Sequence, residues 1–334
     1  MRLHLGYVPL TDAAPLIVAA EEGFAAAEDL TIELSREPSW ATLRDKLALG
    51  HLDGAHLLAP LAIAMAEGLS GAQAPLVVPY VMNLNGNALT VSTALWAEMA
   101  GEGACDGDLT ATARAFGAAA RRRPADRPLK VATVFPFSTH SIQLRLFAEA
   151  AGLRLHEDLY LTVVPPPAMA RTLDHGAIDA FCVGSPWNGV AVDAGAGRIA
   201  AFGVDIAPDA PEKVLALPAG RTGPAAALVR ALRAAGTWCA DPANRERLAA
   251  LLAAPRHLDL DPAPILRSLA GDLTVAPDGT RRAHPRYITF GDGRPSPEQE
   301  RWLREAMEPA APRLPGAAPL FRPDLYDAAV AGAP

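Results

Sequence analysis

The chain has 334 residues, of which 50% are hydrophobic and 20% charged, and its formal net charge is -7. This length allows two domains, and the composition is that of an ordinary globular protein. The acidic balance and scattered basic residues exclude the concentrated positive surface that nucleic-acid binding requires, and no apolar run reaches the length of a membrane span. We therefore expect neither a nucleic acid nor a membrane as a partner.

The chain starts with a strand pattern rather than a signal peptide. Met1 is followed by the alternating segment Arg2–Pro9, which has no charged region, apolar stretch or small-residue cleavage site of the secretory type. Taken as a native start, Met1 predicts a cytoplasmic protein. The alternative is a longer chain from which an export signal has been trimmed.

Strands and helices alternate along the chain. Asp12 is the capping candidate of the first helix, and Ser39 that of the second. The cluster Asn83–Asn87 predicts a turn at which the chain passes to another lobe. The run Arg121–Arg123 is interpreted as a solvated loop, and the tail from Arg313 is expected to lack repetitive structure. The main predicted elements are strands over 2–9, 75–82, 88–92, 129–133, 160–164, 180–183 and 199–204, and helices over 14–27, 40–49, 57–68, 141–151, 169–174, 225–238 and 244–252.

One segment of the first half is repeated in the second. Leu47–Gly54 and Leu173–Ala180 share a leucine, a glycine, an aliphatic residue and an aspartate in the same register. Each copy follows a strand and a proline turn, at Pro38 and at Pro165–Pro167. Linked β-α units of this kind predict an α/β fold with two related lobes, each with a mixed, mostly parallel sheet, and a cleft between them. The predicted lobes are 1–86 with 204–334, and 87–203.

Eight short motifs are distributed along the chain. They are Gly6–Leu16, Ser39–Trp40, Asn85–Ala88, Phe135–His140, Val164–Pro167, Phe181–Asn188, Pro211–Leu215 and Phe321–Tyr326. Together they resemble the nitrate- and bicarbonate-binding receptors of ABC transporters, the NrtA/CmpA-like family. The resemblance covers nearly the whole chain, and it implies the fold of type II periplasmic binding proteins, whose two lobes close over an oxyanion.

The missing signal pattern points to one branch of this family. Most members carry an export signal, whereas the NasS-like nitrate/nitrite sensors are cytoplasmic. The resemblance therefore implies a sensor that binds an RNA-binding antiterminator of the ANTAR type and releases it when nitrate or nitrite is present. The alternatives are an exported nitrate receptor of an ABC transporter and, from another class, an enzyme similar to thiamin-precursor synthases. Because hydrolase, phosphate-loop and zinc-protease motifs are absent, we expect no enzyme and no cofactor.

The resemblance also implies which residues bind the anion. Nitrate is a planar, weakly basic monoanion, so its site needs hydrogen-bond donors, positive charge and a flat wall. Lys213 matches a lysine of the nitrate branch, where bicarbonate receptors have an acidic residue that helps to bind calcium; it therefore favours nitrate and argues against a metal. His140 matches a histidine at a helix start, where anions are favoured. Trp40 matches a tryptophan that offers an N–H and a flat face, and Asn87 lies near the place of an amide donor.

Ordinary structural roles remain open to these residue types. A lysine in a turn is usually exposed, a tryptophan at a helix start usually packs in the core, and an asparagine beside glycine usually forms a turn. Thr11 and Ser138 are secondary candidates at two equivalent helix entrances, where a hydroxyl can cap the helix or contact a ligand. Trp187 and Asn188 are expected to hold the strand crossover, and Cys182 to be a small buried hydrophobe.

Overall fold

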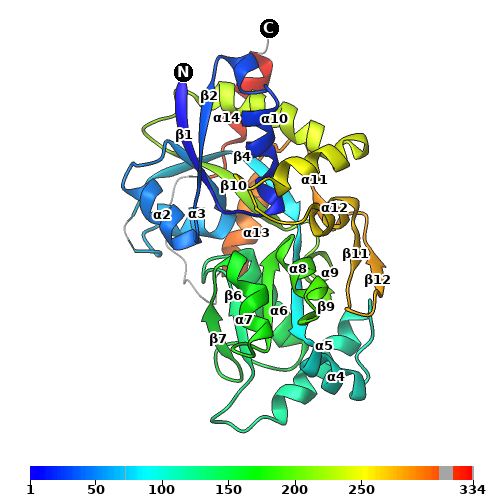
Figure 1. The fold of residues 1–334 in the computed structure, drawn as a ribbon. Helices are drawn as coiled ribbons and strands as arrows, with labels where there is room; N and C mark the ends of the chain where they lie inside the picture. The colour runs from blue at the N-terminus through cyan, green and yellow to red at the C-terminus, as the bar shows by residue number, and fades with distance from the viewer. Residues whose placement is uncertain (72, 308–318, 333–334) are drawn as a thin grey trace.

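The computed structural model describes residues 1–71, 73–307 and 319–332. Two lobes lie one above the other in Figure 1, and each is built on a β-sheet flanked by helices. Within the described ranges, no helix combines the length and apolar character that crossing a membrane requires.

The sheet of the first lobe has six strands in the order β13-β4-β10-β3-β1-β2. Strand β1 pairs in parallel with β2 and β3, whereas β10 is antiparallel to both β3 and β4. The strands are β1 (Arg2–Tyr7), β2 (Thr31–Arg36), β3 (Gly54–Leu58), β4 (Leu76–Asn85), β10 (Pro211–Pro218) and β13 (Ile288–Thr289).

The sheet of the second lobe has five strands in the order β7-β6-β8-β5-β9. Strand β6 is parallel to β7 and β8, as expected for linked β-α units, and β5 is antiparallel to β8 and β9. Both sheets are thus more mixed than mostly parallel, because the strands that connect the lobes join each sheet in the antiparallel direction. The strands are β5 (Asn87–Ser92), β6 (Lys130–Thr133), β7 (Tyr160–Val163), β8 (Ala180–Gly184) and β9 (Gly197–Phe202).

The chain passes between the two sheets twice. Strand β4 ends at Asn85 and β5 begins at Asn87, and the turn between them has positive φ angles of 60° at Asn85 and 98° at Gly86. Such angles are readily adopted by glycine and tolerated by asparagine. The chain returns from β9 through the short helix α9 (Gly203–Ile206) to β10. Residues next to both passages therefore lie where the lobes meet.

Helices cover both sheets and enclose the apolar cores. Around the first sheet they are α1 (Ala14–Glu21), α2 (Trp40–Ala48), α3 (Ala59–Ala66), α10 (Ala225–Ala240), α11 (Arg245–Ala253), α12 (Pro262–Ala270), α13 (Pro297–Met307) and α14 (Pro323–Ala331). Around the second they are α4 (Thr93–Gly101), α5 (Leu109–Arg121), α6 (Thr139–Ala150), α7 (Met169–Asp174) and α8 (Trp187–Asp193). The hairpin of β11 (Asp272–Thr274) and β12 (Arg281–Ala283) lies beside β9, the edge strand of the second sheet. There the backbone N–H of Ile199 donates to Val275 O over 2.9 Å.

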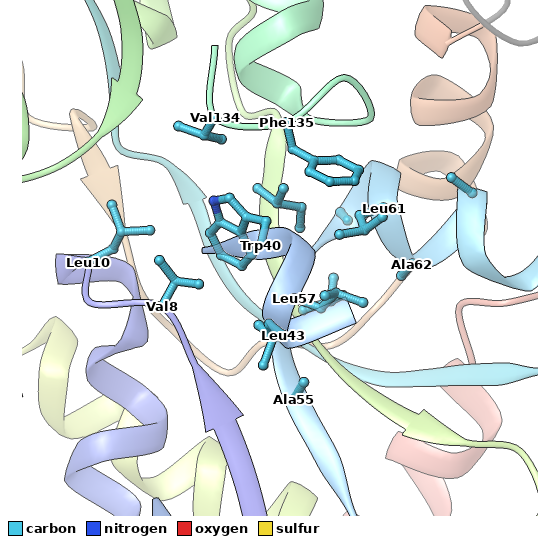
Figure 2. Packing of buried hydrophobic residues seen from close by; sticks show 14 of the residues in the cluster. Val8, Leu10, Trp40, Leu43, Ala55, Leu57, Leu61, Ala62, Val134 and Phe135 are labelled. Atoms are coloured by element: carbon cyan, nitrogen blue, oxygen red, sulfur yellow. The ribbon is translucent and has the colours of Figure 1, made fainter. Parts of the chain in front are cut away.

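One apolar core continues from the first lobe into the second. It contains Trp40 and Leu43 of α2 together with Val134 and Phe135, which follow β6. Figure 2 shows Trp40 next to Val134 and Phe135 at the junction. The lobes are therefore in direct contact, and the structure is a closed form.

The repeated Gly-x-x-Asp segments have the same structural role in both lobes. Asp53 Oδ2 accepts a hydrogen bond of 2.9 Å from the backbone N–H of His4 in β1. Asp179 Oδ2 accepts one of 2.8 Å from the backbone N–H of Lys130 in β6. Each aspartate thus ties the start of the last strand of its unit to the first strand. The repeat is scaffold rather than binding site.

Of the two predicted helix caps, one is confirmed and one is wrong. Ser39 caps α2 as predicted, because its Oγ accepts from the Thr42 backbone N–H over 3.2 Å. Asp12 does not cap α1; it lies in the 3-10 turn η1 (Thr11–Ala13) and faces the interior.

Two predicted loops contain helix. The run Arg121–Arg123 is not entirely loop, because Arg121 is the last residue of α5. The predicted tail begins outside the described residues at Arg313, and its described part contains α14. The amphipathic pattern of α5 extends through Arg121, and Pro323 stands at the first position of α14, where proline is compatible with a helix.

Candidate functional site

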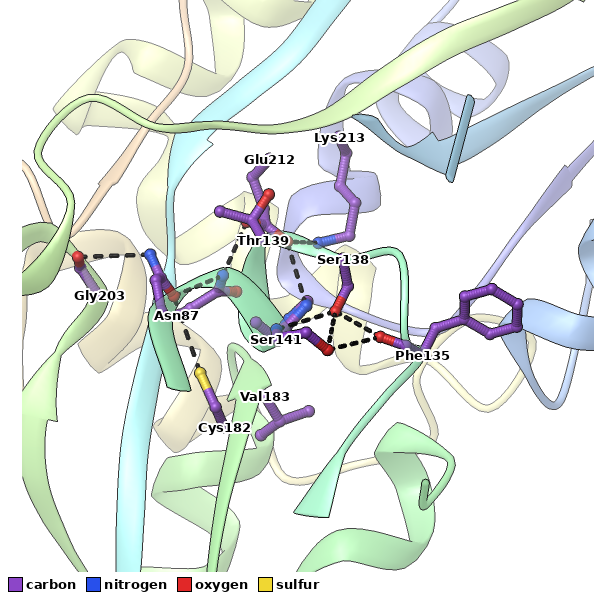
Figure 3. A network of polar contacts seen from close by, with 12 residues as sticks. Asn87, Phe135, Ser138, Thr139, Ser141, Cys182, Val183, Gly203, Glu212 and Lys213 are labelled. Carbon is purple, nitrogen blue, oxygen red and sulfur yellow. Dashed lines mark hydrogen bonds and ion pairs between the residues drawn. The ribbon is translucent and has the colours of Figure 1, made fainter. Parts of the chain in front are cut away.

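Lys213 lies at the centre of a buried polar cluster between the lobes. Its side chain is fully buried, and Nζ lies 2.7 Å from Asp12 Oδ2 and 2.8 Å from Glu212 Oε1. Figure 3 shows the contact with Glu212. Burial acts to lower the pKa of Lys213, but the two carboxylates outweigh it and raise the pKa. The predicted positive charge is therefore present, and it is already paired with two negative groups.

Glu212 and Lys213 face the same cluster although they are neighbours in β10. Successive side chains of a regular strand point to opposite faces of the sheet. The pairing of β10 with β4 shifts register between Pro211 and Lys213 and again between Lys213 and Val214. A bulge of this kind turns a side chain away from its regular direction. The irregularity explains how two adjacent charged residues enter one site.

Asp12 and His56 form the second part of the cluster. His56 Nε2 lies 2.9 Å from Asp12 Oδ1, and both side chains are buried. Burial acts to raise the pKa of Asp12, but Lys213 and His56 outweigh it and lower the pKa to about 2. Burial also lowers the pKa of His56, against the effect of Asp12. The pair therefore consists of a neutral imidazole that donates to a carboxylate.

The second lobe contributes an amide and a histidine. Asn87 Nδ2 donates to Glu212 Oε2 over 2.7 Å and to Gln143 Oε1 over 3.1 Å. His140, the second residue of α6, has its Nδ1 3.4 Å from Glu212 Oε1. Burial lowers the pKa of His140 to about 4; Glu212 opposes this effect and Lys213 adds to it. At neutral pH the imidazole of His140 is uncharged.

Trp40 supplies a flat wall and an unused donor. It begins α2, and its indole is completely buried. Lys213 Nζ lies 5.5 Å from the centroid of the ring, and the indole Nε1 has no hydrogen-bond partner among the described residues. In Figure 2 the indole nitrogen points to the side of Val134, toward the second lobe.

Unpartnered polar atoms gather in this cluster. A buried polar atom without a hydrogen bond costs about 1–3 kcal/mol, so several at one place indicate a missing small polar ligand. Such a ligand must accept hydrogen bonds, because the indole can only donate. The buried atoms of the cluster that lack a partner within the described part of the chain are Trp40 Nε1, His56 Nδ1, Asn87 Oδ1, His140 Nδ1 and His140 Nε2.

The four predicted ligand-binding residues are thus brought together, and the secondary candidates have other contacts. Ser138 caps α6, because its Oγ accepts from the Ser141 backbone N–H over 3.1 Å. Thr11 joins the lobes: its backbone N–H donates to Ser185 O over 2.8 Å. Its hydroxyl lies 3.5 Å from the Ser185 hydroxyl.

Further contacts hold the cleft closed around the cluster. Trp187 Nε1 of the second lobe donates to Pro9 O of the first over 2.9 Å, so it joins the lobes at the loop after β1 rather than at the strands that connect them. At Gly184 a Cβ atom would lie 3.1 Å from Leu10 Cδ2 and 3.3 Å from Asp12 Oδ2, so the lobes approach closely there. A groove of about 630 Å³ lies outside this seam, between the two proline turns at Pro38 and Pro165.

Three residues of the cluster were missed in the sequence: Asp12, His56 and Glu212. Asp12 was assigned to helix capping, for which its position before α1 is equally suitable. His56 had a usable signal, because it is the one polar side chain in the otherwise apolar β3 segment Gly54–Leu58. Glu212 had none, since strand alternation predicts that it points away from Lys213.

The chain is similar in sequence to several known proteins. A model of the NMT1-like family matches residues 1–253. The nitrate/nitrite binding protein NrtA of Synechococcus elongatus is 33% identical over 87% of this chain and 63% of its own length. The bicarbonate transport ATP-binding protein CmpC of the same species is 34% identical over 91% of this chain and 44% of its own length. The chain thus spans less than two thirds of the length of these relatives.

The structure is also similar to a solved one. The crystal structure of the periplasmic nitrate-binding protein NrtA from Synechocystis PCC 6803 superposes with a TM-score of 0.88, at 26% identity, and covers 99% of this chain and 88% of that chain. The expected periplasmic-binding-protein fold is confirmed.

Proposed function

The chain belongs to the NMT1-like family, and from that premise we propose that it binds nitrate or nitrite in the cleft between its lobes. The observation that carries this proposal is the set of unpartnered polar atoms around Lys213, above all Trp40 Nε1 and His140 Nε2. Both come from residues that the resemblance to nitrate receptors singled out. The relatives named for nitrate and nitrite support the identity of the ligand.

The chemistry of the cluster suits a small planar oxyanion. The indole face of Trp40 supplies a flat wall, and its N–H supplies a donor that no protein group uses. Lys213 supplies an ammonium group behind that wall, and its presence favours nitrate over bicarbonate within this family. Neither a metal nor a cofactor is part of the proposal.

Anion binding is proposed to favour the closed form over an open one. A ligand shifts such an equilibrium only by its differential affinity for the two forms. Donors from both lobes meet in the closed form, Trp40 from the first and His140 from the second. An anion that contacts both gains interactions that the open form lacks.

The closed and open forms give the protein a means of signalling. We propose a cytoplasmic sensor whose open form binds an antiterminator of the ANTAR type and whose anion-bound form releases it. Because binding is linked reciprocally, an antiterminator that prefers the open form must also weaken anion binding. Nitrate-dependent release is therefore the defining property of this proposal.

The second candidate is a transport receptor that delivers the same anion to an ABC permease. The relatives named for nitrate binding and for bicarbonate transport fit this candidate about as well as they fit the sensor. Mass spectrometry of the native protein in separated cell fractions distinguishes the two candidates. A native start at Met1 in the cytoplasmic fraction is expected for the sensor, and an exported, processed form would identify the transport receptor.

An enzyme similar to thiamin-precursor synthases receives less support. Such an enzyme needs a reactive side chain that faces the cleft. Cys182 is the thiol nearest to the cluster in the second sheet, with Sγ 3.7 Å from Gln143 Oε1, and burial raises its pKa well above the usual value. A thiol of this kind is a poor nucleophile.

Calorimetric titration with nitrate, nitrite and bicarbonate at equal ionic strength tests the ligand assignment. Saturable binding of nitrate or nitrite is expected, with bicarbonate much weaker. Binding of bicarbonate alone, or of none of the three, would remove the proposed function.

An immobilised ANTAR-type antiterminator tests the regulatory part. The protein is expected to bind it without nitrate and to elute when nitrate is added, whereas chloride at the same concentration should elute none. If no complex forms without nitrate, the sensor proposal is wrong, and nitrate binding would then belong to the transport receptor.

A further inference from the structure

The buried cluster carries more negative than positive charge before a ligand enters. Asp12 and Glu212 each contribute a carboxylate, and Lys213 contributes the single ammonium group that both contact. With both carboxylates ionised, the formal charge of these three side chains is one negative. All three are buried, and an additional uncompensated charge in such a place costs several kcal/mol. A monoanion therefore binds much more favourably if a positive charge is gained at the same time.

His140 is placed to gain that charge. Its Nδ1 lies 3.4 Å from Glu212 Oε1, and neither of its ring nitrogens has a hydrogen-bond partner among the described residues. A neutral imidazole has one N–H donor, whereas a protonated one has two. A protonated His140 can donate to Glu212 from Nδ1 and to an anion from Nε2. The neutral ring can serve only one of them.

We propose that the cleft takes up its monoanion together with one proton, which His140 holds between Glu212 and the anion. This inference rests on the proposed function and deepens it, since it defines the bound species as nitrate or nitrite plus one proton. The net charge of the cluster then stays at one negative when the site is filled. Glu212 is a positioning residue in this arrangement.

The charged groups around His140 have opposing effects on its pKa. Glu212 and Asp12 favour its protonated form, and Lys213 together with the amino end of α6 opposes it. His56 lies beyond Asp12 and is neutral, and Cys182 on β8 remains a thiol. In the empty cleft the opposing effects and burial dominate, because they hold the pKa of His140 at about 4. The proton is therefore absent before the anion arrives and is taken from solvent on binding.

His56 is less suited to hold this proton. Its Nε2 already donates to Asp12 Oδ1 over 2.9 Å, and its Nδ1 has no acceptor within the described residues. Protonation would create a second N–H without a protein partner beside Trp40, whose ring centroid is 5.6 Å away. His140, in contrast, has the Glu212 carboxylate beside its Nδ1, which can accept a hydrogen bond from the protonated ring.

The test is calorimetric titration of the whole protein with nitrate at pH 7 in two buffers that differ in their heat of ionisation. Uptake of about one proton per nitrate is expected, and the affinity should fall about tenfold from pH 6.5 to pH 7.5, since binding is linked to one proton. Binding with equal heats in both buffers and equal affinity at both pH values would overturn this inference and leave the proposed function standing. A complete lack of binding would overturn both.

Two variants locate the proton. His140→Gln keeps an amide donor but cannot be protonated, so it is expected to bind nitrate far more weakly, and its remaining binding should take up no proton. Glu212→Gln removes one negative charge and is expected to bind nitrate without proton uptake. His175→Gln, which changes an exposed histidine, should retain the uptake of one proton. Continued uptake in the His140 variant would contradict the assignment.

A spectroscopic measurement on the unaltered protein does not depend on how the variants fold. Saturating nitrate at pH 7 should move the ¹⁵N signals of the His140 ring to those of an imidazolium and leave those of His56 neutral. An imidazolium signal from His56, or from neither histidine, would overturn the proposal.

Discussion

Lys213 Nζ lies 2.7 Å from Asp12 Oδ2, a contact that joins the strand β10 to the turn that follows β1. The lysine that family resemblance marks as the positive charge of an anion site is thus one member of a buried ion-pair network. The same buried ion pairs therefore serve both the binding of the ligand and the stability of the fold.

Removal of the Lys213 charge is expected to affect both. Lys213→Met leaves two carboxylates buried without their shared cation, and the loss of one partner from a buried pair costs about 3–5 kcal/mol. Urea denaturation should show a decrease of this size in the free energy of unfolding. Nitrate binding should be undetectable under conditions where the variant is folded.

The matched control removes one of the orphaned charges. The double variant Lys213→Met with Glu212→Gln should recover a substantial part of the lost stability without recovering nitrate binding. If the single variant is as stable as the unaltered protein, the ion-pair network described here is wrong.

Trp40→Phe separates the indole N–H from the aromatic ring. The N–H has no partner in the described structure, so its removal should raise the free energy of unfolding of the ligand-free protein by about 1–3 kcal/mol, apart from the change in packing. The affinity for nitrate should fall by about tenfold, because a hydrogen bond to a charged ligand is lost. Titration and denaturation of the same preparation check both expectations.

Trp187→Phe is the corresponding control. It removes an indole N–H that already donates to Pro9 O between the lobes. We expect it to lower stability or closure more than Trp40→Phe does. Equal nitrate affinity in the Trp40 variant and the unaltered protein would show that the indole does not contact the ligand.

Gly184→Ala tests whether the lobes close on the site. The added methyl would lie 3.1 Å from Leu10 Cδ2 and 3.3 Å from Asp12 Oδ2, so closure is hindered. Nitrate affinity should fall, and small-angle scattering should show less compaction on nitrate addition. Gly197→Ala crowds Thr90 Cγ2 at 2.7 Å and Leu173 Cδ2 at 2.9 Å, both within the second lobe, and should leave the affinity of the folded variant unchanged. A reversed order of the two effects would contradict the closed form.

Stability without ligand is expected to fall in acid. Burial lowers the pKa of His140 from about 6.5 to about 4, so its neutral form is preferred in the fold. The corresponding stability is fully present above pH 6.5 and is lost as the pH falls through 4, by about 3 kcal/mol in all. Denaturation from pH 7 to pH 4 should show this decline, and His140→Gln should make it shallower. Identical slopes would rule out a buried neutral His140.

The two repeated aspartates should affect stability alone. Asp53 and Asp179 each accept one backbone hydrogen bond from the first strand of their unit, and Asp→Ala at either place should cost about 1–2 kcal/mol. Nitrate affinity, measured where the variants are folded, should not change. A loss of affinity without a loss of stability would contradict their scaffold role.

The sequence was informative where one physical rule applies at a time. The repeat, with its glycine and aspartate in fixed register, predicted linked β-α units, and Ser39 was correctly predicted as a helix cap. Asp12 was misassigned because an acid before a helix suits capping and an ion pair equally well. Only the tertiary contact with His56 decides between them.

The charge of the site was beyond sequence reasoning. Glu212 enters the cluster through a register shift in β10, which depends on how that strand pairs with β4. Without Glu212 and Asp12, Lys213 would be a free cation and an anion would need no proton. Because Lys213 is already paired with two carboxylates, a bound anion needs a further positive charge.

The location of the anion is tested most directly by a crystal structure of the protein grown with nitrate. We predict a planar ligand between the lobes, within hydrogen-bond distance of Trp40 Nε1 and His140 Nε2 and beside Lys213. Nitrate bound in solution but found elsewhere in the crystal, with the Lys213 cluster unchanged, would contradict this account.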